Sequence, residues 1–509
     1  MWKYCGHLTG ILGFIGIVIG GATLIGYDTL YNSLLIKFMV VAPGSMSYEM
    51  WSELPMPMYM KVYYFNCTNH IDVQVNGAKP LLKQLGPYVF LEKHEKVNIS
   101  FNADTTVDFY QIKTWFFQED LSNGTLDDEI YTLNVIALSA AESTRWPNSL
   151  AENDYPFLRM SMDGVFQYTE QELFLKTNIR NITFDGIESE LLTMLDGTPM
   201  EGAIQMPFDK FGWFYGRNGS AEYDGLFQMW TGEGDLQKVG QITAWKNESD
   251  LSTLYPSPCS ELTGSAGEFF PPNRDKTSVS YFTPDLCRTI FFNFQDETDV
   301  NGISGYKYVL DSGFVGNGTY NTSNTCYNPH PDLLQQPKGM SGEDIDDIHP
   351  ILDLVNIGLY NGLLNASACK FNAPAYVSFP HFYLADPELL EPFHPDSDLW
   401  PNQKQHESYI SLMPAPGIPL DVAIRMQINF LTRPLEYITL LQDVPTMNYP
   451  MIWFETTTVL TDDIIAQLQL LEIATKMGNI FGGISVGVGA VLGALGLILF
   501  RKRSSSQYV

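Results

Sequence analysis

One short motif in the sequence has the spacing of a catalytic nucleophile. Residues 483–487 read GISVG and match the G-x-S-x-G pattern, which in hydrolases holds a serine on a sharp turn between a strand and a helix. Here the motif lies inside a long apolar run, with no strand before it and no water for a base to activate. The match is therefore a coincidence of small residues, and we expect no nucleophilic serine at this position.

Two groups of residues have the types that bind metals but lack the spacing. The acidic residues between 343 and 347 lack the alternating ligands, central glycine and final glutamate of a calcium-binding loop. His381, His394 and His406 have neither H-E-x-x-H spacing nor a nearby cysteine pair, which zinc sites use. The sequence therefore predicts no metal site and no cofactor, and we predict that the protein is not an enzyme.

The overall charge excludes one large class of partner. The chain has 509 residues with 29 basic and 58 acidic side chains, which gives a net charge of −29. Binding to nucleic acid needs clustered Lys and Arg, and the sequence has no basic run before its last nine residues. We therefore predict no nucleic-acid partner. The 45% of apolar residues also excludes a largely disordered chain.

Two apolar runs near the chain ends predict membrane spans. Residues 8–25 and 480–500 contain no charged side chain, and as helices they would be about 27 and 32 Å long, close to the apolar thickness of a bilayer. The first run follows Lys3 and so has an alternative as a cleaved signal peptide. Its apolar stretch is longer than is usual for a signal peptide and has no convincing cleavage site, so an uncleaved anchor fits better.

The charges around the second run predict the orientation. Arg501, Lys502 and Arg503 follow it directly, and positive residues favour the cytoplasmic side. Two spans then place both termini in the cytoplasm. The expected organisation is a cytoplasmic N-terminus (1–7), a first transmembrane helix (8–30), a glycosylated extracellular or lumenal domain (31–477), a second transmembrane helix (478–500) and a cytoplasmic tail (501–509).

Nine N-x-[ST] glycosylation sequons lie between the two spans, where chance would give roughly four. They begin at Asn66, Asn98, Asn123, Asn181, Asn218, Asn247, Asn317, Asn321 and Asn365. A glycan needs a surface position, so these residues predict surface loops of a domain outside the cytoplasm.

The cysteines agree with an oxidising compartment. Cys5 precedes the first span and is a candidate for palmitoylation, with a plain reduced thiol as the alternative. Cys67 is the odd cysteine of the outer segment, and we expect a buried free thiol. The other four allow three disulfide pairings, between which spacing cannot choose: Cys259, Cys287, Cys326 and Cys369.

The segment between the spans predicts mostly short antiparallel strands. Alternating or β-branched runs are bounded by Gly, Pro, Asn and Asp. They cover residues 60–64, 97–101, 279–282, 306–310 and 376–379. A helix is expected after Thr461, where apolar residues recur at helical spacing toward the second span.

Helical signals in the middle of the chain gather between residues 127 and 180. An acidic first turn at 127–129, followed by apolar residues at helical spacing, predicts a helix that begins near Asp127. The capping box Thr169-Glu170-Gln171-Glu172 predicts a further helix that begins near Thr169.

Glycines at a spacing of four residues occur in both spans. Such pairs permit close helix approach, and we predict that they support a homo-oligomer; the alternative is that glycine is simply common in spans. The pairs are Gly16 with Gly20, Gly483 with Gly487 and Gly489 with Gly493.

Five segments together resemble the class B scavenger receptor family. They are GPYVF (86–90), FGWFYGRNGS (211–220), CSELTGSAGEFFPP (259–272), CKFNAPAYVSFPHFYLADP (369–387) and PNQKQHESYISLMPAPGIPL (401–420). The likeness runs through the whole chain, including the two-span arrangement.

The resemblance implies an α+β fold that is mainly β. It consists of one large ectodomain with an antiparallel β-barrel core, a helical bundle at the apex far from the membrane and an apolar tunnel toward the bilayer, anchored by N- and C-terminal transmembrane helices. It also implies disulfides between Cys259 and Cys326 and between Cys287 and Cys369. The cysteines of the family's third bridge are missing here.

One departure from the family concerns the apex. In the fatty acid translocase branch the apex carries a lysine cluster, and the corresponding positions here are Met160 and Met162, beside Arg159. Five acidic and three basic residues give positions 150–180 a charge of −2, which argues against an anion-binding apex. We therefore expect Arg159, Met160, Met162, Val165 and Phe166 to bind neutral lipid or a protein surface; the alternative is packing between apex helices.

The expected function follows from this resemblance. A cell-surface receptor would bind lipids or lipoproteins and transfer a fatty acid, sterol ester or carotenoid through the tunnel to the membrane bilayer. The alternatives are a receptor for a protein ligand or for an apoptotic-cell or pathogen surface, and a lysosomal sorting receptor. The tail, residues 504–509, lacks an acidic-dileucine ending, which favours the plasma membrane over the lysosomal membrane.

Overall fold

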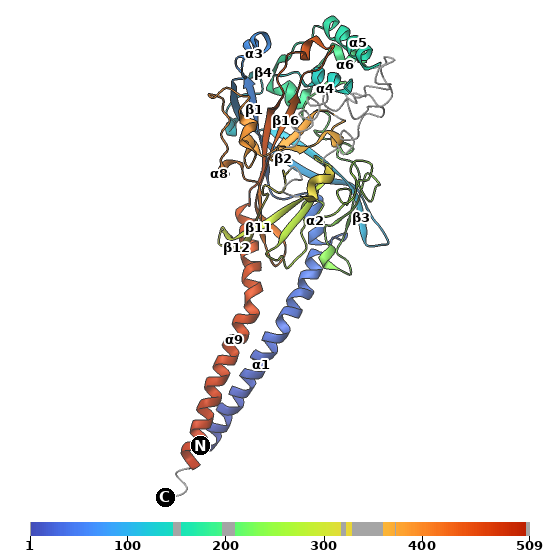
Figure 1. Ribbon diagram of the computed structural model, residues 1–509. Helices are drawn as coiled ribbons and strands as arrows, with labels where there is room; N and C mark the ends of the chain where they lie inside the picture. The colour runs from blue at the N-terminus through green and yellow to red at the C-terminus, as the bar shows by residue number, and fades with distance from the viewer. Residues whose placement is uncertain are drawn as a thin grey trace, which may run out of the picture.

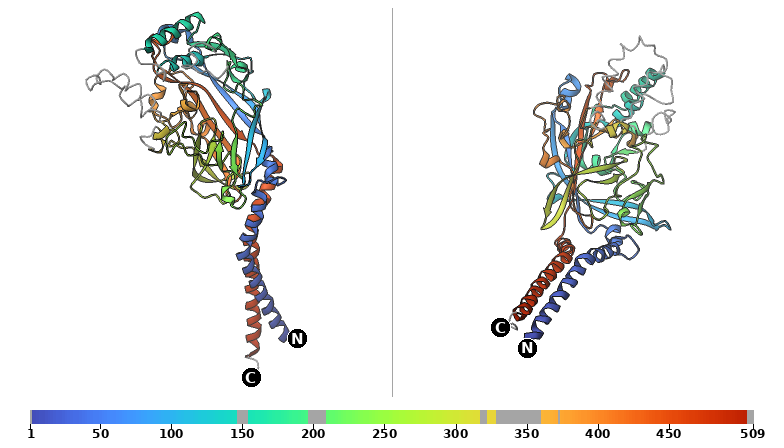
Figure 2. Two further views of the ribbon diagram at one scale, coloured as in Figure 1. Left: turned by 90° about the vertical axis from the view of Figure 1, so that its right-hand side faces the viewer. Right: turned by 60° about the horizontal axis from the view of Figure 1, so that its bottom comes forward.

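Two long terminal helices carry a β-rich body. The computed structural model describes residues 2–145, 154–195, 209–316, 322–327, 360–371 and 373–504. Helices α1 (Trp2–Met39) and α9 (Asp462–Ser504) leave the body at the same end, and both chain ends lie at their far tips (Figures 1 and 2). The stretches long and apolar enough to cross a membrane are His7–Tyr27 and Asp462–Leu499. If both helices cross a bilayer, the two termini must lie on the same side of it.

Glycines allow α1 and α9 to approach each other closely. A Cβ atom on Gly489 would lie 2.7 Å from the carbonyl oxygen of Gly13, and one on Gly20 would lie 2.7 Å from that of Gly482. No real side chain fits at such distances, so glycine is required at this helix contact within one chain. Gly487 has open space around its Cβ position. Association of two chains through the spans remains a prediction.

The body is built on one large antiparallel sheet. Along the sheet the strand order is β10 (Ser278–Thr283), β11 (Arg288–Val300), β12 (Ile303–Val309), β15 (Tyr409–Met413), β16 (Ile418–Thr432), β17 (Met447–Thr458), β1 (Met58–Cys67), β2 (Leu82–Phe101), β3 (Thr106–Phe117), β8 (Phe227–Trp230) and β9 (Ile242–Trp245). Off this path, β13 (Leu364–Asn365) pairs with β14 (Ala375–Ser378), and β14 pairs with β16.

A short extended segment nearly closes this sheet into a barrel. Ser265 forms β-bridges both to Gln241, next to β9, and to Tyr281 in β10, and so links the two edge strands. Gly264 has φ +87°, and a Cβ atom there would lie 3.0 Å from the Ser280 carbonyl. Glycine at this position therefore allows the segment to run close against β10.

A helical cap covers the end of the barrel that lies away from α1 and α9, and Figure 1 shows α4, α5 and α6 there. Strands β4 (Glu129–Leu133) and β5 (Phe174–Asn178) pair with each other, and the chain between them forms α4 (Val135–Ser143) and α5 (Tyr155–Tyr168). The remaining helices and strands are α2 (Met46–Ser52), α3 (His70–Asn76), β6 (Ile187–Glu188), α6 (Glu190–Leu195), β7 (Lys210–Phe211) and α8 (Gln403–His406).

Short turns of helix complete the described elements. They are η1 (Glu119–Leu121), the π-turn η3 (Asn181–Asp185), η5 (Leu236–Lys238), η6 (Thr322–Tyr327), η8 (Ser367–Cys369), η9 (Pro380–Phe382), η10 (Pro387–Leu390) and η11 (Thr439–Leu441).

The mainly β fold, the five predicted strands and the helix after Thr461 are confirmed. The helix predicted to begin near Asp127 is wrong, because residues 129–133 form strand β4. The helix begins after Asn134, whose side chain accepts a hydrogen bond from the Ala137 amide and so caps it.

The helix predicted to begin near Thr169 is also wrong. Thr169 follows the last residue of α5, and its hydroxyl donates to the Val165 carbonyl instead of capping a new helix. The apolar residues behind it form β5, because pairing with β4 satisfies their backbone groups. Helices therefore fill only part of the predicted apex segment, 127–180.

The structure has the two disulfides that the resemblance implied. Cys259 is bonded to Cys326 and Cys287 to Cys369, each with the Cα atoms 5.7 Å apart. Cys259 lies shortly before the closing segment at 264–265, and Cys287 lies in the turn between β10 and β11. Cys67 is a buried free thiol, and burial raises the pKa of its thiol to about 11, so it is unreactive at neutral pH.

Replacing Gly489 by leucine tests the contact between the terminal helices. Because backbone atoms of α1 occupy the space of the new side chain, α1 and α9 must separate. We expect resonance energy transfer between fluorophores attached at the two chain ends to fall. The matched control is Gly487→Leu, whose side chain enters open space and should leave the transfer unchanged. Equal transfer in both variants would contradict the helix contact.

Candidate functional site

Helix α5 gives the apex an inner and an outer face. Leu158, Met162 and Phe166 recur every four residues and are buried against the apex core. The helix is held against α4 by Arg159, whose guanidinium donates to the carbonyls of Thr144 and Arg145 at the end of α4. A cation at this position satisfies carbonyls that the helix leaves free.

Only part of the predicted apex site is accessible. Met162 and Phe166 are 0% and 2% exposed, so packing between apex helices, the alternative interpretation, describes them. Val165 is half-buried, and Arg159 is engaged with the α4 carbonyls. Of the five residues, Met160 alone offers a largely exposed apolar side chain, with 51% exposure.

Two exposed aromatic residues that the sequence analysis missed lie on the same face as Met160. Phe157 and Tyr168 are 73% and 76% exposed, and Gly164 between them has open space at its Cβ position. Positions 157, 160, 164 and 168 follow one another by three or four residues and therefore share one face of α5. We call Phe157, Met160, Gly164 and Tyr168 the apex stripe. Helical periodicity applied to α5 alone would have revealed it.

An ion-pair group ties the apex to the barrel. Glu142 on α4 accepts from Arg145 at 2.9 Å and from Arg433, which follows β16. Arg145 also donates to the Pro434 carbonyl at 3.1 Å. Burial alone would raise the pKa of Glu142, but the charges of Arg433 and Arg145 outweigh it and hold the pKa below its usual value. The position of the apex helices is thus fixed by paired charges.

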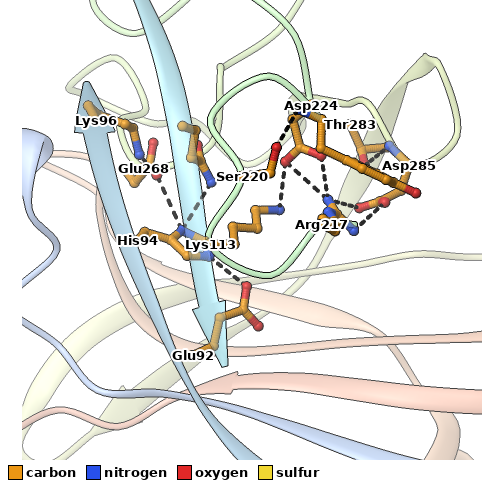
Figure 3. A network of polar contacts seen from close by, with 12 residues as sticks. Glu92, His94, Lys96, Lys113, Arg217, Ser220, Asp224, Glu268, Thr283 and Asp285 are labelled. Atoms are coloured by element: carbon orange, nitrogen blue, oxygen red, sulfur yellow. Dashed lines mark hydrogen bonds and ion pairs between the residues drawn. The ribbon is translucent and has the colours of Figure 1, made fainter. Parts of the chain in front are cut away.

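Inside the barrel, the buried face of the β2–β3 pair has a group of charged side chains between two apolar regions. Phe90 on β2 and Trp115 on β3 belong to an apolar cluster shared with the apex, and Val107 and Phe109 belong to a second cluster near the end of α1. Between the two clusters, cross-strand pairing places polar residues on the same face. We call these residues, with the loop residues they contact, the polar belt. Figure 3 shows Glu92, His94, Lys96, Lys113, Arg217, Asp224, Glu268 and Asp285, and Gln111 lies opposite Lys96 on β3.

One half of the belt centres on His94. Its Nε2 lies 2.6 Å from Glu92, and its Nδ1 lies 3.7 Å from Glu268, which also pairs with the buried Lys96 (Figure 3). Burial alone would raise the pKa of both carboxyls. The contact with His94 outweighs burial at Glu92, and the charge of Lys96 outweighs it at Glu268. The pKa of each carboxyl is thereby lowered to about 2.

The other half centres on Arg217. Its guanidinium donates to Asp285 at 2.8 Å and lies 2.9 Å from Asp224, and Lys113 lies 3.6 Å from Asp224. Burial alone would lower the pKa of Arg217 and raise that of Asp285; the mutual attraction reverses both shifts. The belt therefore carries paired charges at neutral pH and separates the two apolar clusters on this face.

Two segments that carried the family resemblance meet on the barrel. His381 and His406 stack with ring centroids 4.3 Å apart, and Trp453 of β17 contacts both rings edge-on. His381 has φ +54° and Phe382 φ +59°, a strained conformation for residues with a side chain. Burial lowers the pKa of His381 to about 3 and that of His406 to about 4, so both rings are neutral.

The described sequons differ in exposure. Asn98, Asn123, Asn218 and Asn247 are exposed, whereas Asn66, Asn181 and Asn365 are partly buried. Asn317, Asn321 and the tail residues 505–509 lie outside the described residues, and Cys5 lies in α1 outside the described side chains.

Removing Lys96 tests the pairing within the belt. Lys96→Met leaves the Glu268 carboxylate buried without its closest partner, and we expect a loss of about 3–5 kcal/mol in unfolding free energy at pH 7. The double variant Lys96→Met/Glu268→Gln should regain most of it. Lys93→Met, on the exposed face of β2, serves as control and should change stability by less than about 0.5 kcal/mol. Denaturant unfolding of the full chain in detergent measures all three, and equal losses in Lys96→Met and the double variant would contradict the pairing.

The stacked histidines predict a loss of stability in mild acid. Their pKa values are lowered by folding, so below about pH 6.5 the unfolded chain binds more protons and stability falls with pH. We expect about 2 kcal/mol per histidine to be lost by pH 5. His406→Asn should make the pH dependence shallower between pH 6.5 and 5, where carboxyl groups contribute little. An unchanged slope in thermal unfolding would show that His406 is not responsible.

Comparisons with known proteins agree with this architecture. A profile of the CD36 family matches residues 11–500. Protein peste of Drosophila melanogaster is 32% identical over 494 residues, which cover 96% of this chain and 82% of the relative. Scavenger receptor class B member 1 of Bos taurus is 28% identical, covering 88% and 80%. Lysosome membrane protein 2 of Homo sapiens is 27% identical, covering 89% and 86%. The chain therefore belongs to the CD36 family.

Proposed function

We propose that this protein is a class B scavenger-type receptor that binds lipid or lipoprotein particles at its apex and passes lipid through the ectodomain to the bilayer. The observation that carries the proposal is the apex stripe, an exposed apolar helix face at the far end of a membrane-anchored CD36-family chain. Removal of apolar side chains from water is favourable, so such a face is suited to an apolar surface.

The chemistry of the stripe favours a neutral lipid surface. It contains Phe157, Met160 and Tyr168 and no charged side chain. The adjacent cation, Arg159, bonds to the end of α4 instead of facing outward with a free charge. Methionine adapts to irregular partners, and tyrosine combines an apolar ring with a polar tip that suits a lipid–water interface.

Transfer through the protein would keep the apolar chain of the lipid out of water. Each methylene gains about 0.8 kcal/mol on leaving water, so a free long-chain lipid crosses the aqueous gap slowly. A path through the body from the apex toward the bilayer, apolar except at the polar belt, would lower that barrier without nucleotide hydrolysis or catalysis. The extent of the barrel between the apex and the terminal helices supports this part of the proposal (Figure 1).

The proposed topology places both termini in the cytoplasm and the body outside, at the plasma membrane. The basic residues 501–503 and the common direction of α1 and α9 support it. The lysosomal membrane is the alternative, since one relative is a lysosome membrane protein. We propose the four exposed sequons, Asn98, Asn123, Asn218 and Asn247, as the principal glycosylation sites.

A triple substitution tests the apex. Phe157→Ser/Met160→Ser/Tyr168→Ser removes the apolar stripe without touching the buried face of α5. We expect binding and uptake of a fluorescent sterol ester from lipid particles to fall by about tenfold or more, because each lost apolar contact costs about 1 kcal/mol or more.

The control replaces two exposed aromatic residues of the body, Phe291→Ser/Phe371→Ser, and should leave uptake unchanged. Binding measured in the cold separates docking from transfer. Uptake in the triple variant equal to wild type, at equal cell-surface amounts, would contradict the apex proposal. Particle binding without any lipid uptake by the wild type would instead favour a docking receptor for a protein or cell surface.

A further inference from the structure

Unsatisfied hydrogen-bond donors gather where the polar belt meets the apolar cluster of the apex. Arg217 Nε and Trp115 Nε1 are buried and have no hydrogen-bond partner among the described residues. The Trp115 indole N–H acts on the Glu92 carboxyl as a weak donor and helps to lower its pKa, but the contact falls short of full hydrogen-bond geometry. Lys113, which has three N–H donors, has its nearest carboxylate oxygen, on Asp224, at 3.6 Å. A buried donor without an acceptor is costly, so Arg217 Nε and Trp115 Nε1 point to a missing partner, and Lys113 lies beside them with donors to spare.

The three donors converge on one place. Lys113 and Trp115 are two residues apart on the same buried face of β3, and the guanidinium carbon of Arg217 lies 5.7 Å from the centre of the Trp115 ring. In Figure 3 Lys113 and Arg217 both reach toward Asp224 from different elements. The side chain of Lys113 is 15% exposed, so a group of the size of water reaches it.

An aromatic wall lies directly beside these donors. The Trp115 ring is 5.7 Å from Phe184 and 5.6 Å from Phe214, and the two phenylalanine rings are 5.6 Å apart. All three residues belong to or pack against the apolar cluster of the apex. The site is therefore amphipathic, with donors on one side and apolar rings on the other.

The charges of the site select the kind of partner. Acidic Glu92, Asp224 and Asp285 are balanced by basic Lys113, Arg217 and Lys370, so no net charge calls for a counter-ion. What the site lacks is acceptors, because both unpaired atoms, Arg217 Nε and Trp115 Nε1, are donors. An oxygen that accepts hydrogen bonds fits, whereas a cation or a hydrocarbon would leave the donors unpaired.

We propose that Lys113, Trp115 and Arg217 form a subsite for the head of a lipid that accepts hydrogen bonds, a fatty-acid carboxylate or an ester carbonyl, with its chain along Trp115, Phe184 and Phe214. This inference rests on the proposed lipid-binding function and deepens it. The subsite distinguishes lipids that carry an acceptor oxygen from pure hydrocarbons, which gain nothing from the donors. The polar belt would then be the place where the lipid head binds during passage through the body.

Binding of three probes to the purified full chain in detergent tests the subsite. The probes are oleate, methyl oleate and octadecene, which share an eighteen-carbon chain and carry a carboxylate, an ester or no acceptor. Lys113→Met should weaken oleate binding by about tenfold, the value expected for a hydrogen bond to a charged group. Trp115→Phe keeps an aromatic ring at this position but removes the indole N–H donor, and should weaken oleate and methyl oleate by about fivefold. Octadecene should bind to Lys113→Met as it does to wild type, and should lose less affinity than oleate in Trp115→Phe, where only part of the apolar ring contact is removed.

A control variant and the pattern of losses across the probes decide the outcome. Lys93→Met, on the exposed face of β2, should bind every probe as wild type does, and thermal unfolding checks that each variant is folded. Oleate and methyl oleate binding unchanged in both Lys113→Met and Trp115→Phe would overturn the subsite and leave water as its occupant. Equal weakening for octadecene would also overturn it, because packing and not hydrogen bonding would then be lost.

A larger loss for oleate than for methyl oleate in Lys113→Met identifies a carboxylate head, and equal losses identify a carbonyl head; either supports the subsite. A wild-type chain that binds none of the probes would overturn the proposed function as well.

Discussion

Charge pairing inside an apolar barrel is the constraint on which this structure depends. Arg217 and Lys96 are almost fully buried, and each is tolerable only because carboxylates stand within ion-pair distance. Lys96 joins β2 to Glu268 and Lys113 joins β3 to Asp224, whereas Arg217 joins the loop that carries it to Asp285. These pairs fix how the loops lie against the barrel. A second set, Glu142 with Arg145 and Arg433, fixes the apex helices on the barrel in the same way. A wholly apolar interior would not specify these positions so narrowly.

The same constraint shapes how lipid is handled in our account. One apolar cluster joins the apex to the adjacent part of the barrel. A second cluster joins the opposite part of the barrel to the end of α1 that meets the body, where Met39 is buried. The polar belt lies between them, so an uninterrupted apolar channel along the β2–β3 face does not exist in the described part of the chain. In the proposed path, the polar head of a lipid would bind at the belt while its apolar chain lies along the aromatic rings on the apex side of it.

The sequence predicted the strands and the spans well because both depend on local patterns. Alternation sufficed for residues 60–64 in β1, and apolar length sufficed for α1 and α9. The helix prediction failed between residues 127 and 177. Ile130 and Leu133 suit either a helix or a strand, and pairing with β5 decides for a strand. The belt was also missed, because Glu268 and Lys96 are 172 positions apart and only the fold brings them together. The apex prediction included Met160 but omitted Phe157 and Tyr168, since it followed the family's lysine positions and not the face of the helix.

Photo-crosslinking can follow lipid from the apex through the body of the protein. Lipid particles would carry a fatty acid with a photoreactive group at the end of its chain, and labelled peptides would be identified after illumination of intact cells. If lipid enters at the apex and proceeds through the body, label will appear first on α5 and then on β3 around Trp115. Label confined to α1 and α9, at every time and particle concentration, would mean that lipid reaches the bilayer without passing through this protein.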